Sequence, residues 1–206
     1  GSFGVQLCAV TGANAIGIVG SDDKKEHVLS LGAKGVLNRK DFNCWGQLPT
    51  VNGPEFKDYM KESRKFGKAI WELTDKKDVD IVFEHPGEST FPVSVFVVKR
   101  GGMVVICAGT TGFNLTMDAR FLWMRQKRVQ GSHFANLKQA SAANQLVINR
   151  RIDPGMSEVF PWEDIPAAHD KMLDNKHLPG NMAVLVTSPK PGLRTVEDVL
   201  AVNGQA

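Results

Sequence analysis

Residues 78–108 read DVDIVFEHPGESTFPVSVFVVKRGGMVVICA, and this stretch decides the fold. The apolar run at residues 78–84 predicts a strand, and residues 89–99 predict a helix entered through Pro92. Residues 102–108 are almost purely apolar and predict a second strand. Such runs fit strands that are buried on both faces, as in parallel sheets. Two strands joined by a covering helix are typical of an α/β domain.

The chain upstream repeats this alternation of helical and strand-like patterns. Ser21, followed by two acidic residues, is typical of a helix N-cap, and Gly32 is typical of a helix end. The expected helices cover residues 3–13, 21–31 and 65–74, and the expected strands cover residues 14–20 and 34–38. This order predicts a doubly wound, Rossmann-type parallel sheet.

Two regions interrupt the alternation. Residues 41–64 form an insertion with several turn signals, and its last part is expected to be a helix of mixed charge. Further on we expect two more strands, at 156–160 and 182–187, a helix between them at 164–173, and a polar tail from Pro189. We therefore divide the chain into a nucleotide-binding domain, residues 1–150, and a returning segment of a catalytic domain, residues 151–206.

Composition and charge exclude several classes of protein. The 206 residues carry 25 Lys and Arg against 22 Asp and Glu, and this net charge of +3 is too mild to indicate a nucleic-acid binder. No apolar run approaches the roughly 18 residues that cross a bilayer, and no secretory signal opens the chain. The 3 cysteines are scattered without CxxC spacing, which argues against a disulfide framework and against a metal site. We expect a cytoplasmic protein.

The first residues, Gly1-Ser2-Phe3-Gly4, have the pattern of the second half of a glycine-rich dinucleotide loop. In such a loop the last glycine lets helix and strand pack closely, and the helix N-terminus faces a pyrophosphate. We expect Ser2, Phe3 and Gly4 to contact a dinucleotide. A strand should precede this loop, so we expect a sheet that lacks its first strand in a fragment of a longer protein.

The end of the second expected strand indicates which dinucleotide is bound. An NAD site places an acid there to bond the ribose 2′-hydroxyl. Here Ser21 and Lys25 suit a 2′-phosphate, through a hydrogen bond and a point charge, and they favour NADPH. The acidic Asp22 leaves NAD binding open as the alternative. In the ordinary interpretation, Ser21 is only a helix N-cap and Lys25 lies on a solvated helix face.

Three strings are more specific than any glycine pattern. They are DIVFEHPGESTFPVSVFVVKRGGMVVICAGTTGFN from Asp80, ARFLWMRQKR from Ala119 and GSHFANL from Gly131. They resemble crotonyl-CoA carboxylase/reductase, a member of the medium-chain dehydrogenase/reductase superfamily. The resemblance covers essentially the whole chain. It implies hydride transfer from NADPH to the β-carbon of crotonyl-CoA and capture of CO2 at the α-carbon, which gives ethylmalonyl-CoA.

The resemblance also implies an active-site histidine. His85 follows a strand, at the carboxyl edge where ligands of open α/β sheets gather. In the family the matching histidine helps to hold CO2, and an imidazole N–H can position that molecule for attack by an enolate. A lone histidine more often bonds backbone. Glu84 is the second candidate catalytic residue, as a partner of His85 or of a lysine.

The remaining candidate cofactor residues follow other strands. Cys107, Ala108 and Gly109 are small, as close approach of a nicotinamide ribose requires, although they also fit an ordinary turn. By resemblance, His133 and Phe134 line the nicotinamide end, with a structural histidine as the alternative. Arg39 follows the strand at 34–38, where a guanidinium can stack on adenine or remain solvated.

Three functional hypotheses remain. The first is an NADPH-dependent enoyl-CoA carboxylase/reductase, with enoyl-CoA and CO2 as substrates, and the family implies a homo-oligomer, a dimer or a tetramer. The second is a non-carboxylating enoyl-CoA or quinone reductase of the same fold. The third is an inactive nucleotide-binding fragment.

Overall fold

The computed structural model describes residues 1–174, 176–178, 180–186, 188, 190 and 201. The chain forms two compact units. Unit 2 is continuous, from Asn14 to Phe134, and unit 1 combines Gly1–Ala13 with Ala135–Ala206. Most of the polar tail expected after Pro189 lies outside the described residues. No helix in the described part of the chain has the length and apolar character that a membrane crossing requires.

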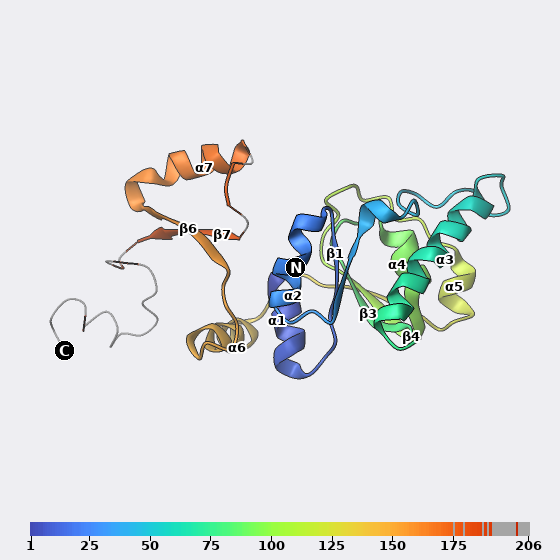
Figure 1. Cartoon of the computed structure of the whole chain (residues 1–206), viewed down its shortest axis with the longest axis horizontal. Helices are drawn as coiled ribbons and strands as arrows, with labels where there is room; N and C mark the ends of the chain where they lie inside the picture. Colours follow the sequence, from blue (N-terminus) through green and yellow to red (C-terminus); the bar gives the residue numbers. More distant parts are fainter. Residues whose placement is uncertain (175, 179, 187, 189, 191–200, 202–206) are drawn as a thin grey trace. The chain divides into compact units, whose positions relative to one another are not determined.

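Unit 2 alternates strands and helices, as the sequence predicts (Figure 1). Its elements are β1 (Ile16–Val19), η1 (Asp22–Lys24), α2 (Lys25–Ser30), β2 (Gly35–Asn38), η2 (Arg39–Asp41), α3 (Phe56–Leu73), β3 (Val79–Glu84), α4 (Phe91–Val97), β4 (Val98–Ile106), α5 (Ala119–Trp123) and β5 (Arg128–Gly131). Every strand pairing in these described elements is parallel.

The strands of unit 2 form two separate sheets, β1-β2 and β3-β4-β5. A doubly wound sheet has the strand order 3-2-1-4-5-6. If β1 and β2 are its second and third strands, the separation between β1 and β3 falls where that order places the first strand. The α/β Rossmann-type fold expected from the sequence is confirmed, and the break in the sheet matches the expected lack of a first strand.

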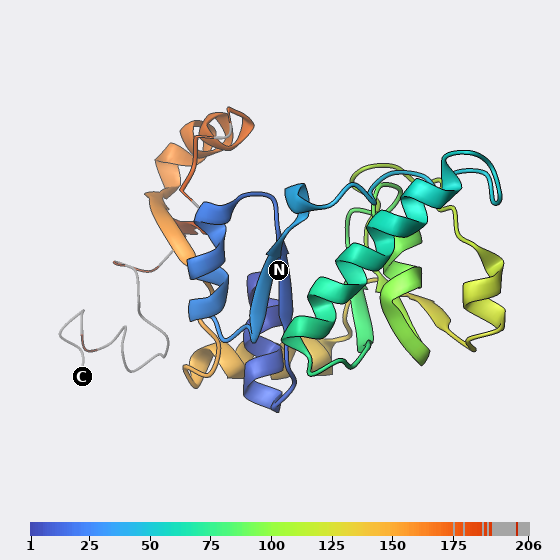
Figure 2. The same ribbon diagram turned by 45° about the vertical axis from the view of Figure 1, so that its right-hand side comes forward.

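The core of unit 2 lies between α3 and both sheets (Figure 2). Phe66 and Ile70 of α3 are buried, and Ile16 of β1 and Val82 of β3 pack against the same cluster. Helix α3 therefore joins the two sheets on one face. A second cluster contains Phe91 of α4 and the fully buried Val104 of β4. Burying each such side chain contributes roughly 1.5–3 kcal/mol.

Unit 1 contains α1 (Ser2–Thr11), α6 (Leu137–Ile148), β6 (Met156–Pro161), η3 (Trp162–Asp164), α7 (Ile165–Leu173) and β7 (Asn181–Leu185). Strands β6 and β7 are parallel and are joined through α7, a βαβ arrangement. The buried Gln6 ties α1 to the later segment: its amide donates to the carbonyl of Asp153 at 2.9 Å and accepts from the same residue's N–H at 2.7 Å.

The structure corrects several expected elements. The mixed-charge helix expected at the end of the insertion and the helix expected at 65–74 are one continuous helix, α3, of 18 residues. The helix expected at 89–99 is shorter, because its last residues open β4. Helix α6 was not expected from the sequence, although Asn136 and Gln139 form a capping box at its start.

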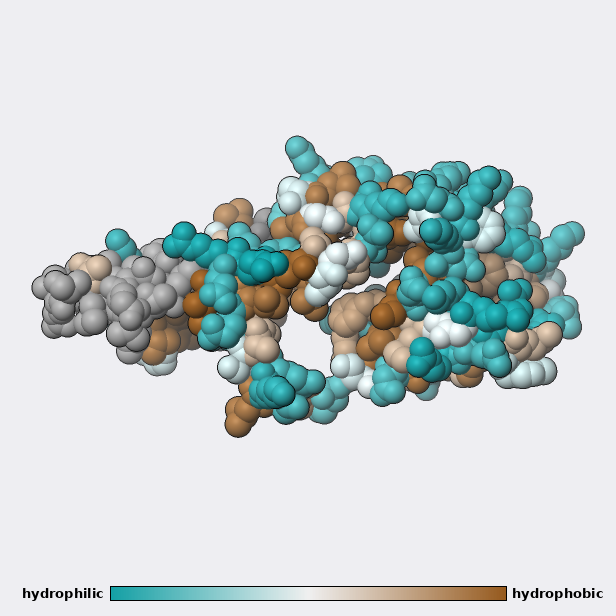
Figure 3. Space-filling model, turned by 90° about the horizontal axis from the view of Figure 1, so that it is seen from below, coloured by the Kyte–Doolittle hydropathy of each residue, from teal (hydrophilic) through white to brown (hydrophobic). Residues whose placement is uncertain are grey.

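Strand β3 is buried on one face only. Ile81 and Phe83 are each 64% exposed, whereas Glu84 is 2% exposed. The expectation of burial on both faces therefore holds better for β4 than for β3. Figure 3 shows apolar surface, in brown, among hydrophilic side chains on one face of the molecule. Ile81 and Phe83 point to the face of β3 opposite Glu84, and this face is uncovered in the described part of the chain.

Candidate functional site

Glu84 and His85 follow each other at the end of β3 but point to opposite faces. Side chains alternate along a strand, and here Val82 and Glu84 face the core, whereas Ile81 and Phe83 are exposed. His85 continues the exposed series. Its imidazole has no hydrogen-bond partner among the described residues, so both ring nitrogens are free to bind a ligand.

The Glu84 carboxylate instead accepts three hydrogen bonds inside the protein. Oε1 accepts from the backbone N–H of Gly87 at 3.0 Å and from Oγ1 of Thr90 at 2.6 Å. Oε2 accepts from Oγ of Ser94 at 2.5 Å. The expectation that Glu84 partners His85 or a lysine is therefore wrong, because the pleat turns its side chain toward α4.

The loops that follow β3 and β4 are bonded to each other. The carbonyl of Pro86 accepts from both N and Oγ1 of Thr111, at 2.9 and 2.8 Å. Glu88 N–H donates to the carbonyl of Gly112 at 3.3 Å, and Ser89 N–H donates to Oγ1 of Thr111 at 3.0 Å. The two loops therefore form one unit at the carboxyl edge of the sheet, beside His85.

Glycines allow the close approach of these loops. Gly87 has φ +86°, and a Cβ there would lie 2.8 Å from Cα of Gly109. A Cβ on Gly109 would itself lie 2.9 Å from the ring of Phe113. Of the candidate cofactor residues here, Cys107 is exposed and Ala108 and Gly109 are partly buried, so the end of β4 presents small side chains.

The insertion after β2 contacts the same edge. Gly46 N–H donates to the carbonyl of Ser89 at 2.6 Å, and Leu48 N–H donates to Oγ1 of Thr116 at 2.9 Å. The side chain of Gln47 donates a short hydrogen bond to the Glu88 carboxylate. The insertion is therefore hydrogen-bonded to the loops that follow β3 and β4, and these bonds hold the loop unit that carries His85.

The ends of β1 and β2 hold the candidate residues for the adenosine part of a dinucleotide. Ser21 occupies the N-cap position of η1, as expected, but its side chain makes no capping hydrogen bond. Lys25 forms an ion pair with Asp22 at 2.7 Å. The hydrogen bond between the Lys25 ammonium and the Asp22 carboxylate lowers the pKa of Asp22 and raises the pKa of Lys25.

Arg39 extends from the end of β2 over the end of β1. A Cβ on Gly20 would lie 3.6 Å from Nε of Arg39, which places the guanidinium against this glycine. Within the described part of the chain, the guanidinium has no hydrogen-bond or ion-pair partner, and the side chain is exposed. Arg39 is therefore an unpaired cation beside Ser21, a position that the spacing of the sequence does not reveal.

The remaining candidates lie after β5 and in the other unit. His133 and Phe134 are both exposed, with ring centroids 4.0 Å apart. Ser132 N–H donates to the carbonyl of Ile106 at 2.8 Å, so this segment continues from β5 beside the end of β4. Ser2, Phe3 and Gly4 form the first turn of α1 in unit 1.

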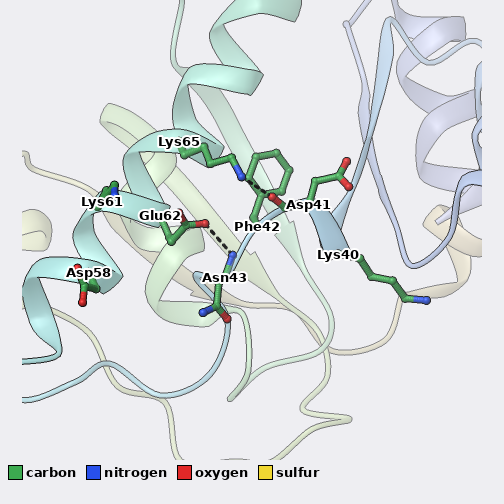
Figure 4. Close-up of a pocket in the computed structure, with 8 residues that line it drawn as sticks. All are labelled: Lys40, Asp41, Phe42, Asn43, Asp58, Lys61, Glu62 and Lys65. Carbon is green, nitrogen blue, oxygen red and sulfur yellow. Dashed lines mark hydrogen bonds between the residues drawn. The ribbon is translucent and has the colours of Figure 1, made fainter.

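A depression of about 640 Å³ lies between the insertion and α3 (Figure 4). Its floor is held by two hydrogen bonds, from Lys65 Nζ to the carbonyl of Asp41 at 2.7 Å and from Asn43 N–H to the Glu62 carboxylate at 3.0 Å. The charged lining residues are Lys40, Asp41, Asp58, Lys61, Glu62 and Lys65. Because cations and anions balance, the depression does not present the single sign of charge that an anionic ligand needs.

No group of three or more His, Cys, Asp or Glu side chains among the described residues has a geometry that could hold a metal ion. Cys44 is 1% exposed in the core of unit 2, and this burial raises the pKa of its thiol to about 12. Small, glycine-bearing loops at the carboxyl ends of parallel strands are the arrangement of a Rossmann-type α/β domain.

The chain belongs to the zinc-binding dehydrogenase family, whose model matches residues 1–149. It is 68% identical over 207 residues to the crotonyl-CoA carboxylase/reductase of Cereibacter sphaeroides. This alignment covers 100% of this chain and 48% of that protein. The family resemblance inferred from the sequence is confirmed. The chain spans about half the length of the curated relatives it matches.

Solved structures agree with this assignment. A crotonyl-CoA carboxylase/reductase structure superposes with a TM-score of 0.91 and 71% identity, covering 98% of this chain and 47% of that one. A 2-octenoyl-CoA carboxylase reductase, CinF, in complex with NADP and 2-octenoyl-CoA has a TM-score of 0.79 and 32% identity, and covers 98% of this chain and 44% of that one.

Proposed function

We propose that this chain supplies the coenzyme-binding part of an NADPH-dependent enoyl-CoA carboxylase/reductase that converts crotonyl-CoA and CO2 to ethylmalonyl-CoA. The observation that carries the proposal is the free imidazole of His85 at the carboxyl edge, on a loop unit built from the ends of β3 and β4. The 68% identity to a crotonyl-CoA carboxylase/reductase supports it.

The residues present fit a phosphorylated dinucleotide. Arg39 is an unpaired cation beside the end of β1, which suits the 2′-phosphate or the adenine face. Ser21 and Lys25 stand at the same end, and Lys25 is partly neutralised by Asp22. Ser2, Phe3 and Gly4, in the first turn of α1, belong to unit 1, so their contact with the pyrophosphate stays a prediction from the sequence.

At the nicotinamide end, the small residues Cys107, Ala108 and Gly109 leave space for close approach of a ribose. We place His133 and Phe134 beside the ring. NADPH held by these residues would supply the hydride that the β-carbon of the enoyl thioester accepts. The electron pair of the former double bond then resides in the substrate enolate.

His85 acts on the second substrate. The oxygens of CO2 accept hydrogen bonds, and an imidazole N–H holds the molecule beside the α-carbon of the enolate. The enolate pair forms the new C–C bond, and the CO2 carbon becomes a carboxylate, so no further oxidant, reductant or proton is needed. Because the imidazole has no internal partner among the described residues, it can form this bond without losing another.

Without CO2 the enzyme acts as a plain reductase. The enolate then takes a proton at the α-carbon and gives butyryl-CoA. The division into residues 1–150 and 151–206, the enoyl-CoA and CO2 partners, and a homo-oligomeric assembly belong to the same proposal.

The test uses an enzyme of full family length that carries this chain. It is incubated with crotonyl-CoA and NADPH, with and without bicarbonate, and the acyl-CoA products are separated by mass. Ethylmalonyl-CoA that depends on bicarbonate supports the proposal. Butyryl-CoA as the sole product under both conditions overturns it in favour of a non-carboxylating reductase.

A further inference from the structure

Glu84 is the most deeply buried ionisable side chain at the candidate site, at 2% exposed. A buried carboxylate is costly unless its oxygens receive hydrogen bonds. Here the three donors are Gly87 N–H, Thr90 Oγ1 and Ser94 Oγ, and the described residues provide no basic partner. The carboxylate is therefore held entirely by neutral donors of the turn and of α4.

These donors lie at the end of the His85-Pro86-Gly87 turn and after it. Gly87 ends the turn, whereas Thr90 precedes α4 and Ser94 lies within it. The backbone carbonyl of Glu84 also accepts from Cys107 N–H at 3.2 Å. One residue thus connects β3, the turn, α4 and the first residue after β4.

The geometry points to Glu84 as a positioning residue: its carboxylate fixes the turn that presents His85, and it neither gives nor takes a proton in the reaction. The consequence for the product rests on the function proposed above. Because Glu84 and His85 face opposite sides of β3, Glu84 acts on the imidazole only through the backbone.

Carboxamide and shortened variants separate positioning from proton transfer. In Glu84→Gln the side-chain oxygen can accept from Gly87 and Thr90, while its NH2 donates to the Ser94 hydroxyl, so the turn is retained. Glu84→Asp keeps the charge but is one methylene short of these donors. A positioning residue therefore tolerates the Gln variant better than the Asp variant, and an acid–base residue shows the opposite order.

Ser94→Ala removes one donor without changing Glu84 itself. Ser63→Ala is its matched control, because Ser63 is also a buried helical serine, but its hydroxyl donates to the carbonyl of Tyr59 within α3 and not to Glu84. Should Glu84→Asp fail to fold, the comparison of these two serine variants still tests the inference.

Two measurements are made on the full-length enzyme. Amide hydrogen exchange over residues 85–91 should be about tenfold faster in Glu84→Asp and in Ser94→Ala, and unchanged in Ser63→Ala and Glu84→Gln. The ratio of ethylmalonyl-CoA to butyryl-CoA should fall by about tenfold in the first two variants, with the rate of NADPH oxidation within about twofold of wild type.

The inference is overturned if Glu84→Gln loses carboxylation as Glu84→Asp does, or if exchange over residues 85–91 and the product ratio stay at wild-type values in Glu84→Asp and Ser94→Ala. Faster exchange with an unchanged product ratio also overturns it, because the turn would then not control His85. If the wild-type enzyme forms no ethylmalonyl-CoA, the proposed function fails, and the exchange rates alone decide whether Glu84 holds the turn.

Discussion

The Nζ atom of Lys25 lies 2.7 Å from Oδ1 of Asp22, one helical turn earlier. The same carboxylate accepts from Nδ2 of Asn38 at 3.1 Å. Asp22 therefore binds the lysine that the sequence assigns to a coenzyme phosphate. A 2′-phosphate at this strand end has to compete with that carboxylate for the lysine.

Substitutions of this pair should change the preference between coenzymes. Lys25→Ala removes one charge-assisted hydrogen bond and should raise the KM for NADPH by about tenfold. Asp22→Asn frees the lysine and should lower the KM for NADPH. Steady-state kinetics with NADPH and NADH measure both effects, and the KM for NADH should change little. Equal changes in KM for NADPH and NADH would show that Lys25 does not contact the 2′-phosphate.

The close contact between the loops at Gly87 and Gly109 can be tested with a matched pair of glycines. Gly87 and Gly101 both have positive φ, +86° and +71°, but a Cβ meets Gly109 only at Gly87 and lies in open space at Gly101. Both Ala variants carry backbone strain of roughly 1–3 kcal/mol.

Gly87→Ala should therefore lower the free energy of unfolding more than Gly101→Ala, and it alone should reduce carboxylation by about tenfold or more. Urea denaturation and product analysis make the comparison. Similar losses of stability and activity in the two variants would show that only the backbone conformation matters and that the loop contact does not.

Cys107 reports on occupancy at the end of β4. Its thiol is exposed, whereas Cys44 is 1% exposed. Burial raises the pKa of Cys44 to about 12, so it should stay unreactive at neutral pH and serve as the internal control. Saturating NADP+ should slow alkylation of Cys107 by about tenfold, measured by peptide mass spectrometry. An unchanged alkylation rate would place the coenzyme away from this strand end.

The free energy of unfolding should depend on pH in the acid range because of Asp118, the N-cap residue of α5. Its carboxylate, almost fully buried, accepts from Nε and Nη2 of Arg120 and from the Arg120 backbone N–H. The Arg120 hydrogen bonds lower the pKa of Asp118 from 3.8. The stabilisation is therefore complete above pH 3.8 and is lost as the pH falls through the lower, folded-state value.

Asp118→Asn should cost about 1 kcal/mol of unfolding free energy at pH 7. The difference from wild type should shrink below pH 3.8. Urea denaturation at a series of pH values measures it. A difference that is constant down to the most acidic pH at which both proteins fold would contradict the role of the ionised carboxylate.

Much of the fold was predictable from the sequence. Apolar runs located β1 to β4 because parallel strands bury continuous apolar stretches. The continuity of α3 was not predicted, because the mixed charge of residues 56–64 masks the buried positions that face the sheets. Helix α6 begins at a capping box formed by Asn136 and Gln139, and this local pattern is the signal in the sequence that marks its start.

The candidate site was predictable in its location but not in its pairings. His85 and the residues after β4 do lie in one bonded loop unit at a carboxyl edge. Glu84 was assigned to His85 by adjacency, although the period of two along a strand already separates them. The partners Thr90 and Ser94 could not be foreseen, because they depend on where α4 lies against β3.

The most direct test of the central claim is the product ratio of the His85→Asn variant in the full-length enzyme, at saturating crotonyl-CoA, NADPH and bicarbonate. If the imidazole holds CO2, the ratio of ethylmalonyl-CoA to butyryl-CoA should fall by about tenfold or more, equivalent to roughly 1.4 kcal/mol of barrier, while NADPH oxidation continues. A ratio equal to that of the wild-type enzyme would contradict the claim.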